Sequence, residues 1–232
     1  MDSARVADAT FILVHGAWHG GWAWEPITQR LTAQKRHVIA VDLPSVRPQL
    51  PSTATFADDV ACVTDAIATA ETDVILVGHS YGGMVITQAA AGRSDVAHLC
   101  FVTALVLDVG QSLAGENDTR IPEWVDLTDD RTASKPRDPV FQFYGDVAPD
   151  VAAHSAAKLG WQSTAALRGP ITHTAWRELP SSYVLCDNDE AISFNAQTSM
   201  AKRTQLQFTL ASAHSPFLSQ PDALAQILLQ LP

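Results

Sequence analysis

The sequence has few cysteines, and their number is odd. Its 232 residues include three, Cys62, Cys100 and Cys186, each within an apolar helical or strand pattern. An odd number without a regular spacing argues against a disulfide framework and is typical of a reducing compartment. We therefore expect three buried, reduced thiols in a cytoplasmic protein.

Positive charge is also scarce. The chain has 15 Lys and Arg against 25 Asp and Glu, for a net charge of −10. Because nucleic acids and anionic membranes attract cationic surfaces, this balance argues against both as partners. With 47% hydrophobic and 17% charged residues, the composition is that of a globular domain rather than a disordered chain.

Long hydrophobic runs are missing as well. The longest, Leu99 to Leu107, is broken by Thr103 and is too short to cross a bilayer, so it is typical of a buried strand. The first ten residues are polar, carry Asp2 and Asp8, and lack the pattern of a signal peptide. We expect residues 1–8 to form a loose tail.

What the chain does contain is a regular alternation of strand and helix patterns. Apolar strand patterns occupy residues 10–14, 37–41, 74–77, 96–106, 182–186 and 206–210. Helical patterns occupy residues 22–34, 56–70, 81–91, 194–202 and 221–231. This alternation predicts an α/β fold with a mostly parallel six-stranded sheet flanked by helices.

Residues 108–177 interrupt the alternation. They lack long apolar runs, carry charges of both signs, and contain Trp124, Trp161 and Trp176. We interpret this stretch as a lid of short helices, inserted into a core domain formed by residues 1–107 and 178–232. Substrate specificity would then lie in the lid.

The most informative stretch follows the third predicted strand. Residues 78–82, Gly-His-Ser-Tyr-Gly, match G-x-S-x-G and stand between a buried strand pattern and a helical pattern. In such a nucleophile elbow, a tight turn strains the middle residue and holds its side chain clear of the sheet. Gly78 and Gly82 suit the close approach of strand and helix. We predict that Ser80 is a nucleophile.

A serine nucleophile needs a base and a carboxylate that orients the base. Of the eight histidines, only His214 lies in the loop between the last strand and the terminal helix. The carboxyl ends of parallel strands meet at one edge of the sheet, where Ser80 and His214 would both lie. Asp187 and Asp189 both follow the penultimate strand at the same edge, and their position alone does not decide between them.

Two backbone N–H groups are expected to bind the oxyanion. Tyr81, directly after the nucleophile, supplies one, and the Gly-rich loop after the first strand supplies the other at Ala17. Trp18 and His19 in that loop, with Trp124 and Trp161 in the lid, are candidate pocket residues. Core packing is the alternative for the tryptophans.

Other chemistries find less support in the Gly-rich loop. His15 and His19 have the spacing of some helical zinc ligands, but Gly16, Gly20 and Gly21 argue against a helix there. The loop also lacks the Lys-Ser/Thr pair that grips nucleotide phosphates. We expect no metal and no cofactor.

Four motifs together resemble a known family. They are residues 11–24 (FILVHGAWHGGWAW), 78–83 (GHSYGG), 187–192 (DNDEAI) with Gln197, and 214–221 (HSPFLSQP). They are similar to the α/β-hydrolase superfamily, more narrowly to small bacterial serine esterase-like hydrolases related to plant methylesterases and hydroxynitrile lyases.

The resemblance implies a triad and an activity. The triad would be Ser80, Asp189 and His214, since the family's triad Asp lies eight residues before a Gln that matches Gln197. The oxyanion would be held at Ala17 and Tyr81. The implied reaction is cleavage of small carboxylic esters through an acyl-enzyme, by a monomer or homodimer.

Two alternatives stay open. Hydroxynitrile lyases of this group carry Lys directly after the catalytic His, and here Ser215 stands in that place, which disfavours cyanohydrin cleavage. The same triad could still act as a base in a lyase or a cofactor-free dioxygenase. Because the relatives include hormone receptors, a receptor-like binding protein with little turnover is the second alternative.

Overall fold

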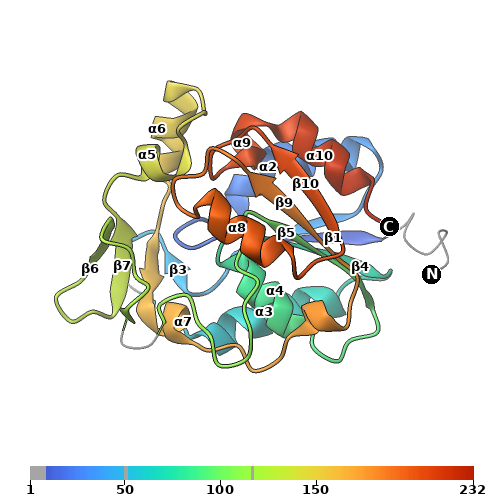
Figure 1. The fold of residues 1–232 in the computed structure, drawn as a ribbon, viewed down its shortest axis with the longest axis horizontal. Coiled ribbons are helices and arrows are strands. Elements are labelled where there is room, and N and C mark those ends of the chain that lie inside the picture. The colour runs from blue at the N-terminus through green and yellow to red at the C-terminus, as the bar shows by residue number, and fades with distance from the viewer. Residues whose placement is uncertain (1–8, 50–51, 116–117) are drawn as a thin grey trace.

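The computed structural model describes residues 9–49, 52–115 and 118–232, so the predicted tail at residues 1–8 lies outside the described residues. Six strands form the main sheet in the order β10-β9-β5-β4-β1-β2 (Figure 1). They are β1 (Thr10–Val14), β2 (Val38–Ala40), β4 (Val74–His79), β5 (Val96–Val102), β9 (Ser181–Cys186) and β10 (Leu206–Leu210). All neighbouring pairs are parallel, which confirms the predicted sheet.

Helices cover both faces of this sheet. One face carries the 3-10 helix η1 (Gly21–Trp24) with α2 (Glu25–Ala33), α9 (Pro216–Ser219) and α10 (Pro221–Leu229), and the other carries α3 (Phe56–Ala68), α4 (Gly82–Ala89) and α8 (Phe194–Ala201). Successive residues of β1 serve opposite faces: Phe11 packs with the first group and Ile12 with the second. Burial on both faces explains why central strands such as β1 and β4 are mostly apolar, whereas the edge strand β10 (LQFTL) is largely exposed and alternates with polar residues.

The inserted segment differs from the expected lid of short helices. It does contain α5 (Pro139–Phe143), α6 (Pro149–Ala157), α7 (Thr164–Arg168) and the 3-10 helix η3 (Ala175–Arg177). It also contains β6 (Val125–Leu127), β7 (Ala133–Pro136) and β8 (Trp161–Ser163), which pair antiparallel with one another and with β3 (Val46–Arg47). A helix-only segment was therefore wrong, because strands this short leave little alternating pattern in the sequence.

Two further expectations need correction. The predicted strand at residues 96–106 ends at Val102, since Thr103 takes a left-handed conformation (φ +35°) that turns the chain. All three cysteines are free, but only Cys100 and Cys186 are buried, whereas Cys62 on α3 is half-buried. None of the described helices has the length and apolar character needed to cross a membrane.

Candidate active site

Ser80 stands at the turn between β4 and α4 in a left-handed backbone conformation, with φ +50°. A Cβ on Gly78 would lie 2.7 Å from the carbonyl oxygen of Gly82, and a Cβ on Gly82 would lie 2.6 Å from that of Val14. Both distances are shorter than real contacts. The steric demand for glycine on either side of Ser80 is therefore present in the structure.

His214 lies in the loop after β10 and is buried. Its Nδ1 is 2.7 Å from Oδ2 of Asp189, which belongs to the loop after β9. Asp187 is exposed, and its carboxylate accepts a hydrogen bond from Asn188 instead. The structure thus places Asp189, and not Asp187, against His214.

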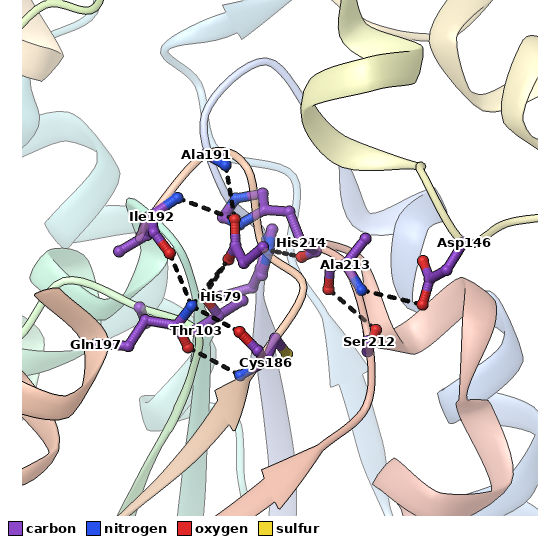
Figure 2. A network of polar contacts seen from close by, with 12 residues as sticks. His79, Thr103, Asp146, Cys186, Ala191, Ile192, Gln197, Ser212, Ala213 and His214 are labelled. Carbon is purple, nitrogen blue, oxygen red and sulfur yellow. Dashed lines mark hydrogen bonds and ion pairs between the residues drawn. The ribbon is translucent and has the colours of Figure 1, made fainter. Parts of the chain in front are cut away.

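Asp189 is held as a carboxylate although it is buried. Its Oδ2 accepts from the Thr103 hydroxyl at 2.5 Å, and its Oδ1 accepts from the backbone N–H groups of Ala191 and Ile192 at 2.7 and 2.9 Å (Figure 2). Burial alone would raise the pKa of Asp189, but His214 and these donors outweigh it and leave the pKa below its usual value. Because a carboxylate only accepts, Nδ1 of His214 carries the proton and Nε2 is free to act as a base.

The backbone on either side of the His214 ring is fixed by two side chains. The ring of His79 donates from Nε2 to the carbonyl oxygen of His214 at 2.8 Å, and burial first of all holds the pKa of His79 well below its usual value. Asp146, between α5 and α6, accepts from the N–H of Ala213 at 3.0 Å (Figure 2). The inserted segment therefore holds the loop that carries His214, a role for Asp146 that no sequence motif indicated.

The Gly-rich loop after β1 passes close to Ser80. A Cβ on Gly16 would lie 2.9 Å from Cβ of Ser80. The next residue, Ala17, lines the same cavity as Ser80, and Trp18 takes a left-handed conformation (φ +63°). Among the described residues, no oxygen accepts a hydrogen bond from the N–H of Ala17 or from the N–H of Tyr81. Both groups are thus uncommitted donors beside Ser80.

A cavity of about 450 Å³ lies at this edge of the sheet and is lined by Ser80 and His214. Three aromatic side chains form one wall: Trp18 stacks on Phe143, with ring centroids 5.8 Å apart, and Trp124 packs edge-on against both. Two of the four predicted pocket residues, Trp18 and Trp124, therefore line this cavity. Phe143, from α5, was missed because short helices in the inserted segment gave no periodic signal.

The other two predicted pocket residues lie elsewhere. His19 is buried behind the loop, where Nδ1 is 2.8 Å from the Ala17 carbonyl oxygen and Nε2 is 2.9 Å from the Tyr144 hydroxyl. Trp161 is half-buried on β8, with the ammonium group of Lys135 over its ring. Neither His19 nor Trp161 is among the residues that line the cavity, because hydrogen bonds hold the His19 ring and Trp161 belongs to the second sheet.

Comparison with known proteins agrees with this architecture. Residues 11–227 match the alpha/beta hydrolase family. This chain belongs to that family. The chain is 32% identical to the alpha/beta hydrolase nvfD of Aspergillus novofumigatus, over 94% of both chains. It is 26% identical to methylesterase 7 of Arabidopsis thaliana, over 95% of both. The crystal structure of a pyrethroid hydrolase from Sphingobium faniae superposes with a TM-score of 0.82, at 25% identity and 95% coverage of both chains.

These matches confirm the α/β-hydrolase fold and the resemblance to plant methylesterases that the four motifs indicated. Members of this family carry a nucleophile on the turn after a central strand, which is where β4 places Ser80.

Proposed function

We propose that the protein is a serine esterase that cleaves small carboxylic esters through an acyl-enzyme. The observation that carries this proposal is the juxtaposition of Ser80, in a strained elbow, with His214, whose Nδ1 is 2.7 Å from the Asp189 carboxylate. Two similar proteins are a methylesterase and a pyrethroid hydrolase, which supports ester chemistry.

In the proposed acylation step, the Ser80 oxygen attacks the ester carbonyl carbon while Nε2 of His214 takes the hydroxyl proton. Asp189 stabilises the imidazolium that forms. The N–H groups of Ala17 and Tyr81 donate to the oxyanion of the tetrahedral intermediate. When this intermediate collapses, the bond to the alcohol oxygen breaks, and His214 gives its proton to that oxygen, so that the alcohol leaves. Water then attacks the acyl-enzyme by the same proton transfers, releasing the acid and restoring Ser80.

The aromatic wall of the cavity favours esters with an apolar or aromatic acid or alcohol part. Trp18, Trp124 and Phe143 offer flat apolar surface to a substrate bound beside Ser80. The partner we propose is thus a small-molecule ester, with no cofactor in the reaction.

The proposal is tested with Ser80→Ala on p-nitrophenyl esters. We expect kcat to fall by about a thousandfold or more, since the attacking hydroxyl is lost. Ser199→Ala is the matched control, because Ser199 is exposed on α8, lies outside the cavity lining and should leave hydrolysis near the wild-type rate. An organophosphonate should label the wild type at Ser80. Near-normal turnover in Ser80→Ala would overturn the serine mechanism.

A further inference from the structure

A continuous chain of buried hydrogen bonds joins the two loops on either side of Ser80. The Tyr81 hydroxyl donates to Oδ2 of Asp59 at 2.7 Å, and the Ser45 hydroxyl donates to the same oxygen at 2.6 Å. Nε2 of Gln162 donates to the Ser45 hydroxyl at 2.7 Å, and Oε1 of Gln162 accepts the N–H of Trp18 at 3.2 Å. All five residues are buried, and none of these side-chain contacts takes part in the chemical steps above.

Every hydrogen bond in this chain donates toward Asp59. The pKa of Tyr81 lies well above its usual value, mainly because the side chain is buried and also because the Asp59 carboxylate is close. The Tyr81 hydroxyl therefore keeps its proton and donates. Oδ1 of Asp59 also accepts the N–H of Ser45 at 3.0 Å, so both carboxylate oxygens are occupied by donors. Bonds that point one way polarise one another, which makes such a buried chain stiffer than separate pairs.

One end of the chain holds the peptide group between Ala17 and Trp18. Gln162 holds its N–H, and Nδ1 of His19, 2.8 Å away, donates to its carbonyl oxygen. The carbonyl oxygen of Trp18 accepts from the N–H of Gly160 at 2.8 Å. With both edges of the peptide plane fixed, Trp18 keeps its left-handed conformation, and the preceding N–H of Ala17 keeps its direction.

The other end of the chain holds the residue that follows the nucleophile. Tyr81 carries the second uncommitted N–H on its backbone, while its hydroxyl reaches Asp59 on α3. A hydroxyl anchored on a separate helix restricts rotation of the Tyr81 backbone. The two N–H groups are therefore linked through α3, through residue 45 and through β8 of the inserted segment.

We propose that the Tyr81 hydroxyl, Asp59, Ser45 and Gln162 are positioning residues that set the Ala17 and Tyr81 N–H groups at the separation an oxyanion requires. This inference rests on the proposed esterase function and extends it. Donors fixed in advance stabilise the developing charge without reorganising, whereas donors that rotate lose that advantage. These hydrogen bonds therefore stabilise the transition state and leave substrate binding largely unchanged.

Tyr81→Phe and Gln162→Met test the proposal, since each keeps the shape of the side chain and removes its hydrogen bonds. We expect kcat for a p-nitrophenyl ester to fall by about 10- to 100-fold in each, with KM within about threefold of wild type. Tyr183→Phe is the matched control. It also removes a buried hydroxyl, but this hydroxyl donates to the Ala104 carbonyl oxygen at 2.9 Å and does not belong to the hydrogen-bond network of Tyr81, Asp59, Ser45 and Gln162. Its kcat should stay within about threefold of wild type.

A second readout separates positioning from simple loosening of the fold. An aryl trifluoromethyl ketone forms a tetrahedral oxyanion adduct with a serine nucleophile, whereas the corresponding alcohol cannot. We expect Tyr81→Phe and Gln162→Met to weaken inhibition by the ketone in parallel with the loss of kcat/KM, and to leave inhibition by the alcohol unchanged. The double variant should lose less than the product of the two single losses, because both break one chain.

Three results would overturn the proposal: both variants keep kcat within about twofold of wild type, ketone inhibition is unchanged, or Tyr183→Phe loses as much activity as Tyr81→Phe. In any of these cases, the esterase function would still be supported if the wild type hydrolyses the ester and Ser80→Ala does not. Hydrolysis that persists in Ser80→Ala would instead remove the proposed function and this inference with it.

Discussion

At the scale of single residues, the identity of the carboxylate beside His214 makes a sharp prediction. Asp189→Asn should lower kcat by about a thousandfold or more, because an amide can hold His214 in the wrong tautomer and cannot stabilise its imidazolium. Asp187→Asn should cost about tenfold or less, since Asp187 is exposed and contacts Asn188. Steady-state kinetics of the two variants decide the question, and the reverse ranking would assign the role to Asp187.

Single residues also mark how far the sequence alone could lead. Ser80 could be predicted because it belongs to a motif flanked by a strand and a helix, and His214 because it follows the last strand. Thr103, Asp146 and Gln162 contact the site just as closely, but they belong to no motif. Their hydrogen-bond partners lie 86, 67 and 144 residues away in the chain, so only the folded structure brings them together.

At the scale of elements, the crossing of β4 and α4 leaves no room for a methyl group at the elbow. Gly78→Ala places a Cβ 2.7 Å from the backbone oxygen of Gly82, so strand or helix must shift. We expect a loss of at least about 2 kcal/mol in unfolding free energy, measured by urea denaturation, together with a loss of esterase activity. Gly145→Ala is the matched control, because a Cβ on Gly145 would lie 3.8 Å from its nearest neighbour, the carbonyl oxygen of Phe141. Equal stability of the two variants would contradict this account of the elbow.

The inserted segment should control which esters are accepted. Trp124 lines the cavity beside Ser80, so Trp124→Ala should change the ratio of kcat/KM between bulky aromatic and short-chain esters by about tenfold or more. Trp161→Ala is the matched control, since Trp161 lies on β8 outside the cavity wall and should leave the ratio unchanged. A ratio that responds to Trp161 and not to Trp124 would show that the pocket lies elsewhere.

The elements themselves differed in how readily the sequence revealed them. All six strands of the main sheet could be predicted. Burial on both faces gives the central strands apolar runs such as residues 74–77, and the exposed edge strand β10 shows the alternating pattern Leu-Gln-Phe-Thr-Leu. The second sheet could not, since β3 has two residues and β6 and β8 have three each. Such strands are held in place by tertiary contacts, and their own sequence pattern is too short to identify them.

At the scale of the whole molecule, buried histidines should make stability fall in mild acid. Burial is the largest cause that lowers the pKa of His15, His19, His79 and His98, to about 3 for His19 and about 4 for His98. Below pH 6.5 these histidines are protonated in the unfolded chain but stay neutral in the folded protein. The unfolded state therefore binds more protons, and stability rises with pH up to that value. Each histidine contributes up to about 1.4 kcal/mol per pH unit. Asp59 opposes the trend, because burial raises its pKa and the folded protein binds that proton more tightly than the unfolded chain does.

Urea denaturation at pH 7 and pH 5 measures this effect. We expect a lower urea midpoint at pH 5 than at pH 7. The difference between the two midpoints should be smaller in His98→Asn, because this variant removes one of the buried neutral histidines, on β5 and away from the cavity. A midpoint that is equal or higher at pH 5 would show that these histidines are not held neutral by the fold.

In the proposed mechanism Ser80 forms a covalent acyl intermediate, and that intermediate can be captured during turnover. The protein is mixed with a p-nitrophenyl ester, quenched in acid within the first turnovers, digested, and analysed by mass spectrometry. We expect the acyl group on the peptide that contains Ser80, with release of about one equivalent of p-nitrophenol per protein before the steady rate. Turnover with no acylated peptide, or with the acyl group on another residue, would show that Ser80 is not the nucleophile.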